Sequence, residues 1–153
     1  MAAGDVVAVA AMARALADFH GDEGSVTARH LSEDCLGPNR QGNVTLALMG
    51  GAPVGFALTY DRAGATDRGG ARHIDQVFVD PGRRRSGVGE ALMKAVARDA
   101  LDHGRERLTV GAAIGNAPAD LFYRKLGFSP RAGGASQYSM SNGPLRALAA
   151  RGD

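Results

Sequence analysis

The chain has 153 residues, which suits a single domain with a substantial buried core and requires no disulfide or metal to hold it together. Its formal net charge is only +2, and outside Arg83, Arg84 and Arg85 the basic residues are scattered, which argues against a nucleic-acid surface. No segment approaches the roughly twenty apolar residues of a membrane span and no secretory leader is visible, so we expect a cytoplasmic protein without a membrane partner.

The first half of the chain predicts two helices followed by a hairpin. Asp5 is the expected N-cap of a first helix that ends near residues 20–21. Its apolar stripe consists of Val6, Val9, Ala13, Leu16 and Phe19 or their neighbours. A second helical segment covers residues 27–36 and is closed by Gly37-Pro38. Residues 44–49 and 54–60 favour strands, and the Gly-Gly-Ala-Pro of residues 50–53 predicts a hairpin turn between them.

The second half predicts a strand–helix–strand unit and a smaller helical segment. Residues 61–70 form a polar connection to a strand at residues 71–79, which a helix at residues 88–103 and a strand at residues 108–113 follow. Asn116 is the expected cap of a helix that ends at Gly127, and Phe128 and residues 137–141 supply two short strands in a polar, strand-forming C-terminal segment. This order predicts one α/β domain over residues 1–153, in three layers.

The cysteine and histidines point away from redox and metal chemistry. Cys35 is the single cysteine and has no base beside it in sequence, so we interpret it as a buried structural thiol. The four histidines lack the spacing of metal ligands, so we expect no metal.

The most informative stretch is residues 73–90, in which an apolar strand, a basic glycine-rich turn and a helix follow one another. Such a turn can direct unpaired backbone N–H groups and the positive end of the helix dipole at an anion, with a preference for phosphate. The P-loop does not fit, because Val88-Gly89 stands where Lys-Ser/Thr is needed, and the dinucleotide fingerprint fails because Leu92 replaces a small residue. A solvated basic turn is the alternative.

Two blocks resemble the signature of the GNAT acyltransferase superfamily. They are Arg84-x-x-Gly87-x-Gly89 behind the apolar strand and, further on, Asn116-x-x-Ala119-x-x-Phe122-Tyr123-x-x-x-Gly127-Phe128. The resemblance implies the α/β GNAT acyl-CoA acyltransferase fold, a central mixed and mostly antiparallel sheet flanked by helices. The family usually opens with a short strand before the first helix, and only residues 1–4 stand there; we expect that this strand is short or missing, or that the given sequence begins after it. An open sheet edge there, with the strand-forming C-terminal segment, leads us to expect a homodimer.

The same resemblance implies acetyl-CoA as co-substrate. The turn would hold its pyrophosphate, the strand edge would meet pantetheine and the thioester carbonyl, and Asn116 would reach the pantetheine arm, with helix capping as its alternative role. The implied acetyl-CoA contacts are Val77, Phe78, Val79, Arg84, Arg85, Ser86, Gly87, Val88, Gly89, Glu90, Asn116 and Phe122.

Direct transfer to an amine further requires an acid and a base. Tyr123 is the family's usual general acid, and a packed aromatic is its alternative role. Asp75 is the expected base, because it shares a strand face with His73 and Val77 and aligns with a Glu of polyamine acetyltransferases. His73 is the rival base, since its ordinary pKa near 6.5 suits the role.

The acceptor is the least defined part of the prediction. The acidic residues Asp22, Glu23, Glu33 and Asp34 resemble a segment of the spermidine/spermine and thialysine acetyltransferases and would suit a small cationic amine, but a solvated face explains them as well. Gln76 departs from the acidic pair of those enzymes. Aminoglycosides, amino acids and the lysines or N-termini of proteins or peptides stay open as acceptors. A CoA-binding sensor without turnover and a nucleic-acid module are the alternative classes of function.

Overall fold

The computed structural model describes residues 1–63, 70–131 and 137–152, and the chain divides into two compact units. The first unit contains Met1–Tyr60 and Gln76–Leu92, and the second contains Asp61–Asp75 and Met93–Asp153. The helices are α1 (Val6–His20), α2 (Ala28–Cys35), α3 (Val88–Asp102), α4 (Ala117–Leu126) and α5 (Asn142–Ala150), with 3-10 turns at Ala3–Asp5 and Pro81–Arg83. The strands are β1 (Gly42–Met49), β2 (Ala52–Arg62), β3 (Ala71–Val79), β4 (Arg107–Gly111), β5 (Ser129–Pro130) and β6 (Gln137–Ser141).

The expected α/β architecture with a mixed sheet is confirmed. In the described residues six strands are hydrogen-bonded in the order β1-β2-β3-β4-β6-β5. The β1–β2, β4–β6 and β5–β6 pairs are antiparallel, whereas β3 and β4 are parallel, which is the pairing that the strand–helix–strand unit requires. Before α1 the described residues form a 3-10 turn and no strand.

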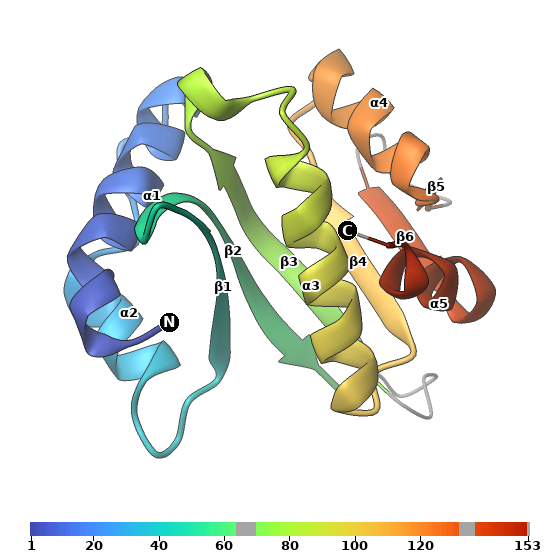
Figure 1. Ribbon diagram of the computed structural model, residues 1–153, viewed down its shortest axis with the longest axis horizontal. Coiled ribbons are helices and arrows are strands. Elements are labelled where there is room, and N and C mark those ends of the chain that lie inside the picture. The colour runs from blue at the N-terminus through green and yellow to red at the C-terminus, as the bar shows by residue number, and fades with distance from the viewer. Residues whose placement is uncertain (64–69, 132–136, 153) are drawn as a thin grey trace. The chain divides into compact units, whose positions relative to one another are not determined.

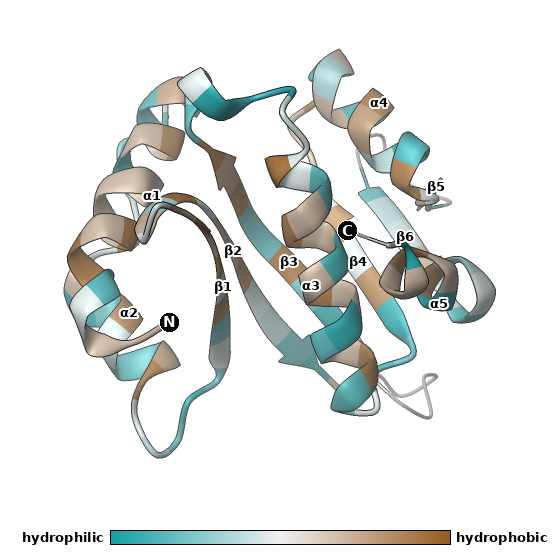
Figure 2. Ribbon diagram, viewed as in Figure 1, coloured by the Kyte–Doolittle hydropathy of each residue, from teal (hydrophilic) through white to brown (hydrophobic). Residues whose placement is uncertain are grey.

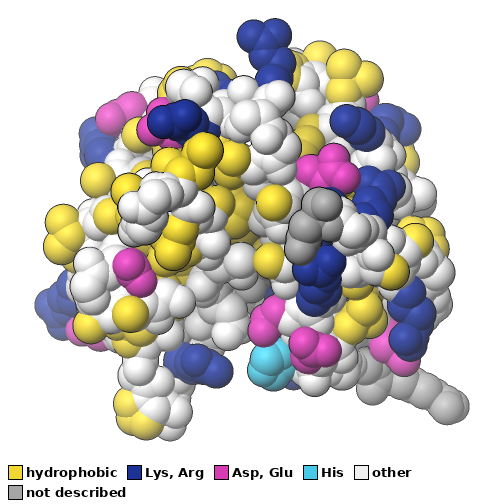
Figure 3. Space-filling view, viewed as in Figure 1, with side chains coloured by type: hydrophobic (Ala, Val, Ile, Leu, Met, Phe, Trp, Pro, Cys, Tyr) yellow, Lys and Arg dark blue, Asp and Glu magenta, His cyan; other side chains and the backbone are white. Residues whose placement is uncertain are grey.

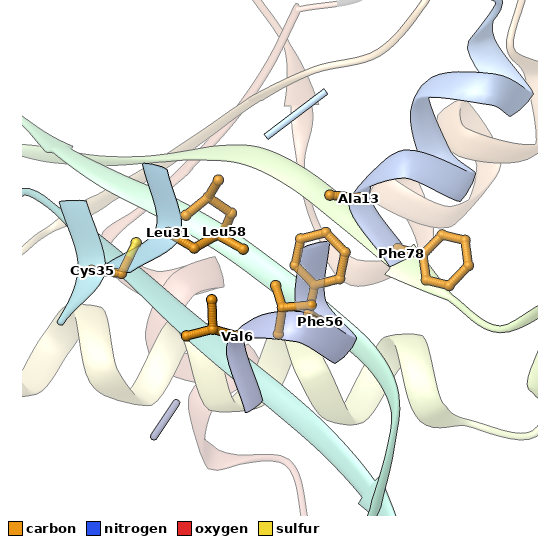
Figure 4. Close-up of a cluster of buried hydrophobic side chains, with 8 residues drawn as sticks. Val6, Ala13, Leu31, Cys35, Phe56, Leu58 and Phe78 are labelled. Atoms are coloured by element: carbon orange, nitrogen blue, oxygen red, sulfur yellow. The ribbon is translucent and has the colours of Figure 1, made fainter. Parts of the chain in front are cut away.

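In the first unit, α1 and α2 cover the β1–β2 hairpin (Figure 1). The buried side chains come from both helices and from β2 and β3, and seven of them are labelled in Figure 4: Val6, Ala13, Leu31, Cys35, Phe56, Leu58 and Phe78. The structure confirms Cys35 as a buried thiol, and burial raises its pKa. Helix α1 is apolar along most of its length (Figure 2), so it can contribute a whole face to this core.

Three details of the first half differ from the sequence prediction. Phe19 is 67% exposed, and Ala17 takes the buried position at that end of α1. The hairpin turn consists of Gly50 and Gly51 alone, both with positive φ (58° and 82°), so Ala52 and Pro53 already belong to β2. Asp5 precedes α1 as expected, but its carboxylate accepts from the N–H of Ala2 instead of capping the helix.

In the second unit, β4 lies between β3 and β6, and α5 follows β6 directly (Figure 1). The sequence prediction missed α5, because we expected the C-terminal segment to form strands. Leu145 and Leu148 bury one side of this helix, and its C-terminal carbonyls are bound from α3, where Arg98 Nε donates to the Ala149 carbonyl at 2.7 Å.

Arg72, on β3, is only 1% exposed and is the largest fully buried side chain of the described chain. Its Nε donates to Asp61 Oδ1 at 2.8 Å and its guanidinium also binds Asp99 of α3, while Arg105 Nε lies 3.1 Å from Asp61 Oδ2. Burial opposes ionisation of Asp61, but Arg72 and Arg105 outweigh it and lower the pKa of this carboxyl. The network satisfies a buried charge, as a folded protein requires.

Within the described residues no helix combines the length and the apolarity needed to cross a bilayer.

Candidate functional site

The glycine-rich turn between β3 and α3 is built by local hydrogen bonds. Asp80 Oδ1 accepts from the N–H of Gly82 at 3.2 Å, which ends β3 in the 3-10 turn, and Ser86 Oγ donates to the Arg83 carbonyl at 2.5 Å. Two residues then take left-handed backbone conformations, Arg85 (φ 60°) and Gly87 (φ 86°). Only glycine adopts this conformation freely, so Arg85 is held in a strained one, a feature that clusters at ligand sites.

Helix α3 begins directly at this turn. The Gly87 carbonyl accepts from the N–H of Ala91 at 2.9 Å, so the first helical turn is formed by residues 88–90. The first N–H groups of an α-helix point out of its N-terminal end, here toward the turn. A Cβ built on Gly87 would meet no atom within 4 Å, and residues 83–87 are all exposed. The turn is therefore open to an incoming anion, with the helix dipole in its favour.

The Arg84 side chain folds back onto the first unit. Its Nε donates to the Val79 carbonyl at 3.1 Å, and its guanidinium carbon lies 5.6 Å from the centre of the Phe19 ring. The backbone edge that we expected to meet pantetheine thus has one of its carbonyls occupied by Arg84. Cation–π stacking also gives the exposed Phe19 a partner. Apolar side chains gather over α1 and the hairpin in Figure 3, and the large exposed ones of this unit are Val7, Phe19, Leu36, Leu48 and Met49.

Phe78 can offer only its backbone to a ligand, because its side chain is buried in the core of the first unit. Its ring centre lies 6.3 Å from that of Phe56, and a Cβ added to Gly55 would come within 2.7 Å of its carbonyl oxygen. The β2 strand therefore approaches β3 closely here, which explains a glycine at position 55. Two residues after Phe78, the N–H of Asp80 donates to the Val54 carbonyl at 2.9 Å.

The two candidate bases on β3 have different surroundings. Asp75 is exposed, whereas His73 is half-buried with its Nδ1 2.9 Å from Thr109 Oγ1 on β4. Burial, together with the charges of Arg62 and Arg131, lowers the pKa of His73, although Asp75 opposes the shift. His73 is therefore neutral at pH 7, and one of its nitrogens is engaged by Thr109.

Gln76, between Asp75 and Val77 on β3, has a side-chain oxygen that is buried and, within the described chain, unpaired. Its Oε1 is buried and has no hydrogen-bond partner among the described residues. A buried acceptor without a donor is destabilising, so the Gln76 side chain lowers the free energy of unfolding.

Helix α4 positions Asn116 and Tyr123 as the sequence predicts. Asn116 Oδ1 accepts from the N–H of Ala119 at 3.2 Å and Gly127 (φ 104°) ends the helix, so the capping role of Asn116 is confirmed. Tyr123 is 7% exposed, and its ring contacts Phe122, Phe128 and Tyr138 with centroid distances of 5.3, 5.5 and 5.7 Å. Burial and the neighbouring Tyr138 raise the pKa of Tyr123 to about 12, so the phenol stays protonated at any physiological pH.

The remaining residues near these elements are the acidic side chains around α2 and three residues that the sequence analysis did not single out. The acidic residues 22, 23, 33 and 34 are all exposed, and Glu33 pairs with Arg29 at 2.8 Å, which fits both a solvated surface and a surface that meets a cationic acceptor. Thr109 and Tyr138 were not predicted, because each reaches its partner across strands or elements distant in sequence. Asp120 lies four residues before Arg124 and binds it at 2.8 Å, a spacing that the sequence does display.

The predicted residues are shared between the two units. The turn residues 84–90 and Val77, Phe78 and Val79 belong to the first unit, while His73, Asp75, Asn116, Phe122 and Tyr123 belong to the second. The described residues contain no group of three or more His, Cys, Asp or Glu that could hold a metal ion.

Comparison with known proteins identifies the family. The model of the acetyltransferase (GNAT) family matches residues 9–128, which include both signature blocks. A mycothiol acetyltransferase of Saccharomonospora viridis is 37% identical over 81 residues, which is 51% of this chain but only 26% of that protein. The chain thus spans a minor part of the length of this relative.

Solved structures share the fold over most of the chain. A putative acetyltransferase from Arthrobacter sp. FB24 is 27% identical with a TM-score of 0.73, covering 88% of this chain and 86% of that one. The aminoglycoside acetyltransferase AAC(6')-Ib in complex with coenzyme A is 18% identical with a TM-score of 0.71, covering 96% and 95% of the two chains. At this identity the second likeness concerns the fold alone.

Proposed function

Because the chain belongs to the acetyltransferase (GNAT) family, we propose that it transfers the acetyl group of acetyl-CoA to a primary amine. The observation that carries the proposal is the exposed turn before α3, whose left-handed residues Arg85 and Gly87 and position at a helix N-terminus suit the pyrophosphate of CoA. A solved neighbour in complex with coenzyme A supports this choice of anion.

In the proposed reaction the neutral amine attacks the thioester carbonyl carbon while both substrates are bound. The C–N bond forms, the C–S bond breaks, and the electron pair of that bond leaves on sulfur, which needs a proton. Tyr123 donates that proton from its hydroxyl. With a pKa of about 12 it is a weak acid, so donation accompanies C–S cleavage and does not precede it. The attacking nitrogen releases one proton to solvent as it becomes an amide nitrogen, and a proton from solvent restores the hydroxyl of the acid.

An alkylammonium acceptor must first lose a proton, and we propose Asp75 as the base that receives it, through water. Its exposure on β3 supports this role. His73 is neutral and therefore able to accept a proton, but Thr109 engages its Nδ1, which leaves only Nε2 for the task. The two assignments predict different pH profiles for Asp75→Asn and His73→Gln.

We propose a small-molecule amine as acceptor, in keeping with the aminoglycoside acetyltransferase among the structural neighbours. The exposed acidic residues near α2 give weaker support for a polyamine. A protein or peptide amine and a CoA sensor without turnover are the competing functions. We further propose that the two units work as one catalytic domain, and that the protein is a cytoplasmic homodimer, for which light scattering that returns the single-chain mass would be contrary evidence.

The experiment that tests the proposal is a thiol-release screen with acetyl-CoA and amines grouped by charge and size. Tyr123→Phe removes only the hydroxyl, so turnover should fall by about 10²–10⁴-fold with little change in acetyl-CoA affinity. Near-normal turnover of Tyr123→Phe with a good acceptor would contradict the acid assignment, and the absence of thiol release with every amine would favour the sensor.

Donor binding has its own matched test. Gly87→Ala should weaken acetyl-CoA binding in calorimetry, because the added Cβ faces the open side of the turn. Gly104→Ala is the control, since Gly104 also has positive φ (70°) and open space, and therefore suffers the same backbone strain at the other end of α3. Equal acetyl-CoA affinity of the two variants would show that the turn does not hold the donor.

A further inference from the structure

Beside Tyr123 lies a second phenol, Tyr138, which comes from β6 instead of α4. The two ring centres are 5.7 Å apart and the planes are inclined by 34°. Like Tyr123, Tyr138 is buried, so the two side chains pack against each other in the second unit. Either hydroxyl could in principle serve as a proton donor, and the surrounding contacts distinguish them.

The hydroxyl proton of Tyr138 is already engaged in a hydrogen bond. Its hydroxyl donates to Asp120 Oδ1 at 2.5 Å, and the same carboxylate accepts from Arg124 Nε at 2.8 and 3.0 Å. This bond to Asp120 raises the pKa of Tyr138, while Tyr138 and Arg124 lower the pKa of Asp120. Asp120 therefore stays ionised at neutral pH and keeps the hydroxyl of Tyr138 pointed at itself.

Tyr123 has the opposite arrangement. Among the described residues no hydrogen bond to its hydroxyl is found, and its position is set by the packing of its ring against Phe122, Phe128 and Tyr138. Phe122 is its chain neighbour and Phe128 follows the end of α4, so Tyr138 is the contact that ties the ring to the sheet. Asp120 lies on α4 three residues before Tyr123, and its bond to Tyr138 thus holds the helix to β6.

From this juxtaposition we propose that Tyr138, held by Asp120, is a positioning residue for Tyr123. Tyr138 fixes the ring of Tyr123 against β6, and Asp120 prevents Tyr138 from donating in its place. The inference rests on the proposed function, since it assumes that Tyr123 donates to the leaving sulfur. A displacement of about 1 Å at a reacting group can lower the rate by up to 10²-fold, so loss of the hydrogen bond between Tyr138 and Asp120 should lower kcat.

The test is a double-mutant cycle on kcat. Tyr138→Phe and Asp120→Ala each remove the hydrogen bond between these two residues and keep the Tyr123 hydroxyl. Each variant should lower kcat about 3–10-fold and leave the KM for acetyl-CoA unchanged. In the Tyr123→Phe background the same changes should lower kcat no further, because the group that they position is absent. Tyr60→Phe, the same chemical change on β2, is the control and should keep normal kcat.

The outcomes separate this inference from the proposed function. Unchanged kcat in both Tyr138→Phe and Asp120→Ala, or a loss that multiplies with that of Tyr123→Phe, would overturn the positioning role while leaving the acid assignment intact. A normal kcat for Tyr123→Phe would instead overturn the proposed acid. If Tyr138→Phe does not fold, Asp120→Ala answers the question, because Asp120 lies at the partly exposed surface of α4 and both phenols remain.

Discussion

Replacing the buried Arg72 by Met tests the charge network that supports β3. The change keeps most of the apolar stem and removes the guanidinium, which binds both Asp61 and Asp99. Breaking a fully buried ion pair by removing one partner costs about 3–5 kcal/mol. Here the carboxylate side chains remain 29% and 43% exposed, so water can replace part of what they lose. We therefore expect the free energy of unfolding to fall by about 2–4 kcal/mol.

Urea or thermal unfolding measures this loss, with a fall in Tm of roughly 2–4 °C for each kcal/mol in a chain of this size. Arg14→Met is the control, because Arg14 pairs with Asp18 at 2.9 Å on the exposed face of α1 and should contribute less than about 1 kcal/mol. If Arg72→Met were no more destabilising than Arg14→Met, desolvation would cancel the attraction in this network, and our reasoning would be refuted.

The same pair of proteins should differ in pH dependence. The folded-state pKa of Asp61 lies below its unfolded value near 3.9, so its contribution to stability is present above that pH and is lost as pH falls through the folded value. The stability advantage of the wild type over Arg72→Met should therefore shrink below about pH 4. An advantage that stays constant down to pH 2.5 would mean that Arg72 acts through packing alone.

The remaining predictions concern single contacts. Gln76→Met should raise the free energy of unfolding by about 1 kcal/mol, because it removes a buried oxygen without a donor. The same change at the exposed Gln41 should leave the free energy of unfolding unchanged, and equal effects of the two changes would mean that the Gln76 oxygen is hydrated. Cys35 should react with thiol reagents only as fast as the protein opens, since its Sγ lies 2.8 Å from where a Cβ of Gly42 would stand, and alkylation at the rate of an unfolded thiol would contradict this packing. Arg98→Met should speed hydrogen exchange in α5 with little change in Tm, because its bonds to the C-terminal carbonyls of that helix are exposed; unchanged exchange would show that α5 is held by its buried leucines alone.

The sequence by itself determined the features that depend on neighbours along the chain. The Gly50-Gly51 turn, the Asn116 cap and the Gly127 stop follow from backbone preferences and from hydrogen bonds over two to four residues. The bounds of β3 follow from its run of apolar residues and from the Asp80-Pro81-Gly82 that ends it. The glycine turn before α3 is of the same kind, because it forms where a strand ends and a helix begins within a few residues. The α/β fold class and the family resemblance rest on such local blocks.

Tertiary structure alone decided which distant residues meet. The pairing of Tyr138 with Asp120, 18 residues apart, and of Arg72 with Asp99, 27 apart, depends on the strands and helices that pack together. Helix α5 was missed for the same reason, since its short segment is stabilised by Leu145 and Leu148 in the core and by Arg98 of α3. Local propensity carries little of the free energy of so short a helix, and packing carries the rest.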